Sequence, residues 1–156
     1  MQWLNQTLFA GAHLYFSMAC TWGIALLAAK FYRRKRQVQK YLFPVTLKNG
    51  TWSVQVLAYY DTGNLLRDPY IGQWVSILDE TVLPPEVTAD WPFRLIPFSS
   101  VGDTSGMMHA FTIEELAIRC GREERRIQPA VVGIAEAKLF EKREYQMILN
   151  SHLMSG

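Results

Sequence analysis

The chain has 156 residues, of which 49% are hydrophobic and 19% charged, and its formal net charge is +2. This balance excludes a disordered or strongly acidic chain, and the length suits one domain with a shorter additional segment. Two cysteines and three histidines are scattered along the sequence without a Cys-x-x-Cys pair or a Cys/His cluster. We therefore expect no metal site and no cofactor.

The first predicted element is a transmembrane helix. Residues 8–29 are mostly apolar over the length that crosses a bilayer, and they contain no formal charge. His13 inside this segment could be functional or could simply pack between helices. A cleaved signal peptide would carry its positive charge before the apolar run, whereas here the charge follows it, so a retained span is favoured. The basic residues are Lys30, Arg33, Arg34, Lys35, Arg36 and Lys40.

This charge pattern predicts the orientation and the domain organisation. Residues 1–40 are expected to form a single-pass anchor in the cell membrane with the N-terminus outside, and residues 41–156 a cytoplasmic domain. The basic cluster could also hold that domain against anionic lipid. Nucleic acid is not an expected partner, because no platform of basic and aromatic side chains follows the cluster.

Residues 41–156 predict a compact, mainly β domain. Apolar and polar residues alternate in residues 51–60, which follow a hairpin signal at Asn49-Gly50. Residues 116–120 follow a helix-capping pattern, but a strand paired with residues 127–132 is favoured. The remaining predicted elements are strands at residues 43–47, 74–78, 93–96, 107–111 and 145–149 and a short helix at residues 135–140. Short strands without βαβ units indicate a single β lobe.

The strongest candidate for catalysis is Asp61, which follows the strand of residues 51–60 directly and precedes Thr62 and Gly63. Asp-Thr-Gly after an apolar strand is typical of aspartic proteases, in which two carboxylates face one water and share a proton. Gly63 would let a backbone N–H reach the carboxylate, and the Thr62 hydroxyl would bond to its counterpart on a second lobe. Because the chain offers no credible second acid, the second lobe would come from another copy of the chain.

Other acidic residues have structural interpretations. The segment Asp103-Thr104-Ser105 could be a second, degenerate triplet of a two-lobed monomer, but no apolar strand precedes it and a polar hairpin tip is favoured. Asp68 precedes Pro69 and suits a turn. A solvated face with the nearby arginines is expected for Glu114, Glu115, Glu123 and Glu124.

The order of these features resembles that of the retroviral-type, single-lobe aspartic proteases. The resemblance implies a flap hairpin after the triplet, an apolar-apolar-Gly segment beneath the catalytic loop, and a last strand, here residues 145–149, that joins an inter-subunit sheet. The candidate flap tip is Gly102, Asp103, Thr104, Ser105 and Gly106, and the candidate segment beneath the site is Val131, Val132 and Gly133.

A longer string is more specific. Residues 60–72, which include Asp61-Thr62-Gly63-Asn64 and Asp68-Pro69, together with residues 96–102, resemble the sporulation sigma-E factor processing peptidases of endospore-forming bacteria. The resemblance implies removal of the propeptide of pro-sigma-E in the mother cell, and activation by a secreted signalling protein from the forespore. It also implies several N-terminal spans, and since this sequence carries one, we expect an N-terminally shortened form.

Three functional classes follow. The favoured class is a membrane-anchored aspartic endopeptidase, active as a homodimer with one Asp61 per chain. The second is a catalytically inactive, membrane-tethered regulatory or binding module on the same fold. The third is an unrelated membrane-tethered regulator in which the triplet is accidental.

Overall fold

The computed structural model describes residues 18, 20–30, 41–100 and 103–154. The chain divides into two units, Met1–Lys40 and Tyr41–Gly156. In the first unit residues 20–30 are helical. Within the ranges described, no helix is both long and apolar enough to cross a membrane. The predicted span of residues 8–29 lies partly outside the described residues, and the basic segment of residues 31–40 lies wholly outside them.

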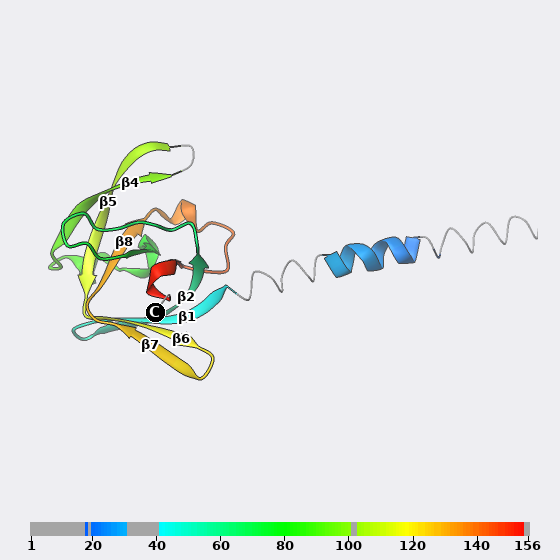
Figure 1. Ribbon diagram of the computed structural model, residues 1–156, viewed down its shortest axis with the longest axis horizontal. Coiled ribbons are helices and arrows are strands. Elements are labelled where there is room, and N and C mark those ends of the chain that lie inside the picture. The colour runs from blue at the N-terminus through cyan, green and yellow to red at the C-terminus, as the bar shows by residue number, and fades with distance from the viewer. Residues whose placement is uncertain (1–17, 19, 31–40, 101–102, 155–156) are drawn as a thin grey trace, which may run out of the picture. The chain divides into compact units, whose positions relative to one another are not determined.

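The second unit is built on one mixed sheet of nine strands, in the order β4-β5-β8-β3-β9-β2-β1-β6-β7 (Figure 1). Its strands confirm the predicted mainly β class. They are β1 (Leu42–Asn49), β2 (Trp52–Asp61), β3 (Val75–Asp79), β4 (Phe93–Ser100), β5 (Asp103–Ile113), β6 (Glu115–Cys120), β7 (Glu123–Ile127), β8 (Ala130–Ala135) and β9 (Met147–Asn150). The connections contain the helix α2 (Pro85–Thr88) and the 3₁₀ helices η1 (Glu80–Val82), η2 (Ala137–Leu139) and η3 (Ser151–Leu153).

The hairpin of β1 and β2 brings the chain to Asp61, as the sequence predicts. All of β1 pairs with β2, from Leu42 opposite Tyr59 to Asn49 opposite Trp52. The turn is shifted by one residue from the predicted position, since its two loop residues are Gly50 and Thr51 rather than Asn49 and Gly50. Gly50 has a φ of 58°, and a glycine at the first loop position is what a two-residue hairpin of type II′ requires.

We expect Gly50→Ala to lower the free energy of unfolding by about 1–2 kcal/mol, because a Cβ at positive φ is strained. No atom lies within 4 Å of the position where that Cβ would be, so a steric clash adds nothing to this cost. Denaturant unfolding of the two chains measures the difference. The matched control is Gly50→Asn, because asparagine tolerates this region of φ, and an equal loss in both variants would contradict the explanation.

The last strand lies inside the sheet, and here the prediction of an inter-subunit strand is wrong. β9 pairs parallel with β2 on one side and antiparallel with β3 on the other. Both of its backbone edges are therefore used within the chain. A second copy cannot extend the sheet through β9 without separating it from β2 or β3.

Three further predictions are corrected in the second half of the domain. β6 is a strand, as favoured, but its partner is β7. The partner that the sequence predicts, residues 127–132, includes the end of β7, a turn and the start of β8. The predicted helix of residues 135–140 is the single 3₁₀ turn η2. Glu115 is buried rather than solvated, because Lys48 lies 3.1 Å from its carboxylate and Gln128 donates a hydrogen bond to it.

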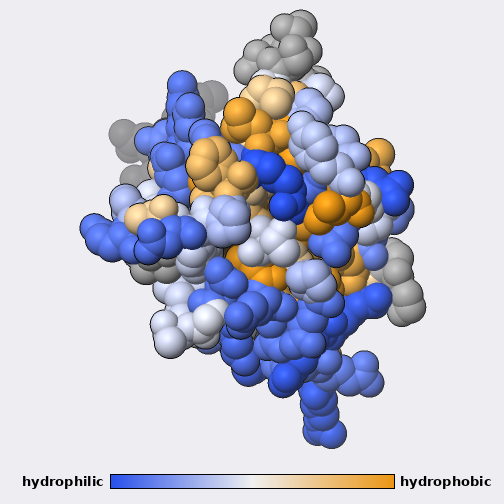
Figure 2. All heavy atoms as spheres, turned by 90° about the vertical axis from the view of Figure 1, so that its left-hand side faces the viewer, coloured by the Kyte–Doolittle hydropathy of each residue, from blue (hydrophilic) through white to orange (hydrophobic). Residues whose placement is uncertain are grey.

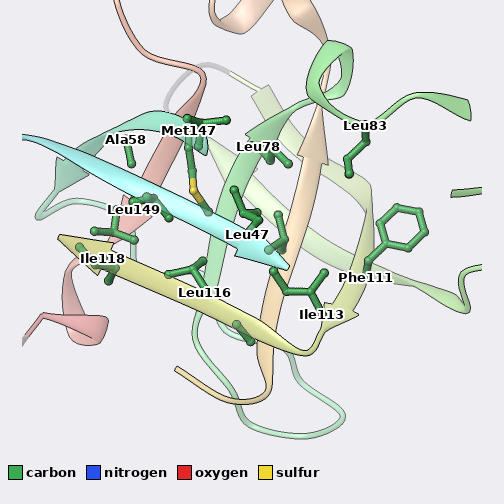
Figure 3. Packing of buried hydrophobic residues seen from close by; sticks show 14 residues of the cluster. Leu47, Ala58, Leu78, Leu83, Phe111, Ile113, Leu116, Ile118, Met147 and Leu149 are labelled. Atoms are coloured by element: carbon green, nitrogen blue, oxygen red, sulfur yellow. The ribbon is translucent and has the colours of Figure 1, made fainter. Parts of the chain in front are cut away.

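Alternating side chains of these strands fill one main core between the layers of the sheet. Leu47 of β1 and Leu116 and Ile118 of β6 point toward Leu78 of β3 and Leu149 of β9 (Figure 3). All five side chains are fully buried. The period of two that is visible in the sequence is therefore the period that selects the core side chains.

A second, smaller core lies where the β4–β5 hairpin meets the rest of the sheet. Ile96, Met108 and Ala110 pack there against Val75 of β3 and Val131 of β8. Near the tip of the hairpin and along β4, apolar residues of the opposite parity are exposed, since Phe93, Leu95 and Met107 are more than two-fifths exposed. Apolar side chains accordingly gather in the upper half of the face turned toward the viewer in Figure 2, where the hairpin lies.

Candidate active site

Asp61 ends β2 and begins a tight loop that exposes Thr62 and Gly63. The Gly63 N–H donates a hydrogen bond of 2.8 Å to Asp61 Oδ1, which is the contact that the sequence predicts. A Cβ on Gly63 would lie 3.3 Å from the same oxygen, so any other residue would crowd the carboxylate. The Asn64 N–H donates to the Asp61 carbonyl oxygen at 3.2 Å and closes the turn. The loop thus holds the carboxylate at its surface with one backbone donor assigned to it.

A buried amide fixes the far side of this loop to β3. Asn64 is 7% exposed, and its Nδ2 donates to the carbonyl oxygen of Val75 at 3.2 Å. Its Oδ1 accepts the N–H of Leu66 at 3.1 Å. The Val75 N–H in turn donates to the Leu66 carbonyl oxygen at 3.0 Å. The residue that follows the triplet is therefore required by the geometry of the loop, because a buried polar group must find partners.

The strand beside Asp61 is β9, and the prediction that Val131, Val132 and Gly133 lie beneath the site is wrong. These three residues belong to β8, which pairs with β3 and β5 and is separated from β2 by β3 and β9. In the register of β2 with β9, Asp61 lies opposite Asn150.

Gly133 has a packing role in this arrangement. A Cβ there would overlap the sulfur atom of Met108 and would lie 3.3 Å from a methyl group of Val75. Glycine makes room for the second core at this point. The pattern apolar-apolar-Gly therefore reflects close packing under the β4–β5 hairpin rather than proximity to Asp61.

The predicted flap lies in the hairpin of β4 and β5, which forms one edge of the sheet. β4 and β5 pair from Phe93 opposite Phe111 to Ser100 opposite Asp103. Asp103, Thr104, Ser105 and Gly106 begin β5, while Gly102 lies outside the described residues. The whole segment is one hairpin of a single-lobed domain, so the alternative of a second active-site lobe built on Asp103 is wrong.

A buried ion pair connects the loop after the triplet to this hairpin. Asp68 is fully buried, and its Oδ1 accepts the N–H of Tyr70 at 2.8 Å. Arg94 of β4 donates its Nε–H to the other carboxylate oxygen and its Nη2–H to Thr112 of β5 at 2.7 Å. Asp68 is thus structural, as the sequence predicts, and through Arg94 it joins the loop that begins at Asp61 to both strands of the hairpin.

The pKa of Asp68 follows from these contacts. Burial alone would raise the pKa of the carboxyl, but the hydrogen bond from Arg94, the N–H groups of Tyr70 and Ile71, and the charge of Arg94 outweigh it and lower the pKa below its ordinary value. Asp68 is therefore ionised at neutral pH.

Two aromatic side chains, Tyr59 and Tyr145, lie near Asp61. The ring of Tyr145 stacks on that of Tyr59 of β2, with centroids 5.1 Å apart and planes inclined by 19°. Burial raises the pKa of Tyr145, the nearby Arg143 opposes this rise, and the neighbouring Tyr59 and Asp61 add to it. Tyr59 and Asp61 are two residues apart on one strand, so both side chains leave the same face of β2.

Three residues of this site carried no recognised signal in the sequence: Arg94, Tyr145 and Asn150. Each comes from a segment far along the chain from Asp61. The one usable signal was the apolar pair Ile148-Leu149, which is followed by asparagine instead of the glycine that the family pattern led us to seek. Within the described ranges, no group of three or more His, Cys, Asp and Glu side chains could hold a metal ion.

Fold and loop together define a small β domain that presents one acid on a glycine-containing turn. The family model described as sporulation factor SpoIIGA, a peptidase family, matches residues 4–153. The chain belongs to this family of sporulation sigma-E processing peptidases and is a protease, which confirms the resemblance of residues 60–72 and 96–102. Among curated proteins, none matches the chain.

Proposed function

We propose that this protease is an aspartic endopeptidase that acts as a homodimer with one Asp61 from each chain. The observation that carries the proposal is the Asp61 loop, in which a carboxylate at the end of an interior strand of the sheet accepts a backbone N–H and remains partly exposed. The other acid of this segment, Asp68, is fully buried and bound to Arg94, so it is not free to act.

Two such loops facing each other would supply the chemistry of peptide hydrolysis. Two carboxylates that hold one water cannot both ionise, so one of them keeps a proton. The ionised carboxylate takes a proton from the water, whose oxygen attacks the carbonyl carbon of the substrate. The protonated carboxyl donates a hydrogen bond to the carbonyl oxygen, and a proton then passes to the leaving amine.

The family and the sequence support the biological setting that we propose. The substrate is the pro-form of sigma-E, the enzyme is anchored in the cell membrane with its protease domain in the mother-cell cytoplasm, and a secreted protein from the forespore activates it. The β4–β5 hairpin acts as the flap over the substrate. Because β9 is enclosed by β2 and β3, the two copies meet through surfaces other than an added strand at β9.

A mixing experiment tests the proposal of one acid per chain. A fixed amount of wild-type chain is combined with increasing amounts of the Asp61→Asn chain, and cleavage of the pro-form of sigma-E is followed. If chains pair at random, an equal amount of variant traps half of the wild-type chains in inactive mixed dimers, and the rate falls to about half.

The control is the Asp90→Asn chain, which changes an exposed aspartate and should raise the rate when added. A rate that stays unchanged when the Asp61→Asn chain is added would contradict the shared site. Wild-type dimers that form but never cleave the pro-form of sigma-E would instead support the alternative of a catalytically inactive binding module.

A further inference from the structure

Asn150 is a fully buried polar side chain beside the Asp61 loop. It is the last residue of β9, it is 0% exposed, and it lies opposite Asp61 in the pairing of β9 with β2. Asparagine is seldom buried to this degree unless its hydrogen-bonding groups are all used. Its position next to the catalytic strand therefore calls for an account of its partners.

The side chain of Asn150 joins three elements. Its Nδ2 donates to the carbonyl oxygen of Leu66 at 3.0 Å and to that of Val75 at 3.3 Å. Its Oδ1 accepts the N–H of His152 at 3.1 Å and so caps η3. Its backbone N–H donates to the hydroxyl of Ser76, which is also fully buried, at 3.1 Å. The residue has therefore used both amide protons, its side-chain oxygen and its main-chain donor.

The two hydrogen bonds that the Asn150 side chain donates go to Leu66 and Val75, and the side chain of Asn64 bonds to the same two residues. Leu66 ends the loop that begins at Asp61, and Val75 begins β3. The Val75 carbonyl oxygen accepts from both Asn64 and Asn150. Asn64 and Asn150 thus both fix the contact between Leu66 and Val75, and Asn150 connects this contact to β9.

A carboxylate could not replace this amide. An ionised aspartate only accepts hydrogen bonds, so at position 150 its oxygens would face the carbonyl oxygens of Leu66 and Val75. A protonated aspartate would regain one O–H donor. The site therefore distinguishes a donor from an acceptor of almost the same shape, which makes the role of the amide testable.

We propose that Asn150 is a positioning residue for catalysis: by donating to Leu66 and Val75 it fixes the Asp61 loop against β9 and β3 and so sets the place of the Asp61 carboxylate. This inference rests on the proposed function of Asp61. Paired carboxylates must be held to a fraction of an ångström to share a proton and a water. The loop has one side open to solvent, and Asn150 supplies the support from the opposite side.

The test compares Asn150→Asp with wild type in steady-state cleavage of the pro-form of sigma-E by the full chain. At about pH 7 we expect kcat to fall about 10-fold to 100-fold while KM changes little, because geometry is lost and substrate contacts are kept. Burial raises the pKa of the new carboxyl, so lowering the pH to about 5 protonates it and restores one donor. The ratio of variant to wild-type kcat should therefore rise as the pH falls.

Dividing the kcat of the variant by that of the wild type cancels the effect of other titratable groups near the site, since both chains contain them. Among the described residues that pair or hydrogen-bond with Asn150, Asp61 of β2 and His152 of η3 carry titratable side chains, and the loop that begins at Asp61 also carries Arg67 and Asp68; all four are present in the wild type. From β3 come only the hydroxyl of Ser76 and the carbonyl of Val75. Asn49→Asp makes the same chemical change at the other end of the β1–β2 hairpin, and it should leave the ratio near one at every pH.

Asn150→Ser separates positioning from capping. Serine can still cap η3, but its short side chain cannot reach both carbonyl oxygens, so kcat should fall by a factor that does not depend on pH. This variant carries the test if Asn150→Asp does not fold at neutral pH. Wild-type kcat in Asn150→Ser, or a loss in a folded Asn150→Asp that is equal at all pH values, would overturn the inference. Cleavage by an Asp61→Asn chain in the same assay would instead overturn the proposed function.

Discussion

Asp61→Asn is expected to lower kcat for cleavage of the pro-form of sigma-E by about 10³-fold or more, because it removes both the general base and the general acid of a symmetric site. Asparagine has nearly the shape of aspartate, and its Oδ1 can still accept the hydrogen bond from the Gly63 N–H. The loop and the fold should therefore persist. An amide neither takes a proton from water nor gives one to the substrate, so the chemistry alone is lost.

Measuring the effect of Asp61→Asn needs a control in which the same substitution is made at an aspartate outside the site. Initial rates of cleavage are compared among wild type, Asp61→Asn and Asp90→Asn, and thermal unfolding shows whether each chain is folded. Asp90 is exposed in the segment before β4, so its variant should cleave at the wild-type rate. A folded Asp61→Asn chain that keeps more than about a tenth of the wild-type kcat would exclude aspartic catalysis at this position.

Local patterns were sufficient to predict most strands and the position of Asp61. The alternation in residues 51–60 depends on neighbours two residues apart, and it survives in the burial of Val56 and Ala58. The turn that follows is predicted by Thr62, Gly63 and Asn64, and the N–H groups of Gly63 and Asn64 donate to Asp61 within four positions of the chain. Interactions of this range are visible in a sequence without knowledge of the fold.

The neighbour of β2, the strand that ends at Asp61, could not be predicted in the same way. Both Val131-Val132-Gly133 and Ile148-Leu149-Asn150 are short apolar runs, and either could pair with β2. Glycine favoured the first run because the family pattern ends in glycine. In the structure the second run pairs with β2, where the side chain of Asn150 supplies hydrogen bonds that a glycine could not make. Strand order depends on pairings between distant segments, which periodicity does not specify.

Buried charge was the other feature that composition concealed. Glu115 lies in a segment rich in charged residues, and the sequence predicts a solvated face there. Its carboxylate is instead enclosed by Lys48 of β1 and by Gln128. The partner of Asp68 is likewise 26 residues away, on a strand whose sequence is mostly apolar. Burial of a carboxylate beside a distant partner can be predicted only when the pairing of the strands is known.

Asp68→Ala is expected to lower the free energy of unfolding by about 3 kcal/mol, because it leaves Arg94 without its carboxylate and the N–H groups of Tyr70 and Ile71 without an acceptor. We place the value at the lower end of the range for buried pairs since the side chain of Arg94 is 28% exposed. Denaturant unfolding at neutral pH measures this change. The milder Asp68→Asn keeps an acceptor for the N–H groups and should cost less. An equal loss in both variants would contradict a role for the acceptor, and an unchanged stability in Asp68→Asn would contradict a role for the charge.

The contribution of Asp68 to stability should also disappear in acid, and the direction follows from its pKa. The folded chain has the lower pKa, so between the two pKa values the unfolded chain binds more protons and stability rises with pH. The contribution is complete above about pH 4, the ordinary range for aspartate, and is lost as the pH falls through the folded value. The difference in unfolding free energy between wild type and Asp68→Asn should thus be constant from about pH 5 to 8 and shrink below about pH 4. A difference that stays constant down to about pH 2 would show that the carboxylate charge does not stabilise the link between the Asp61 loop and the hairpin.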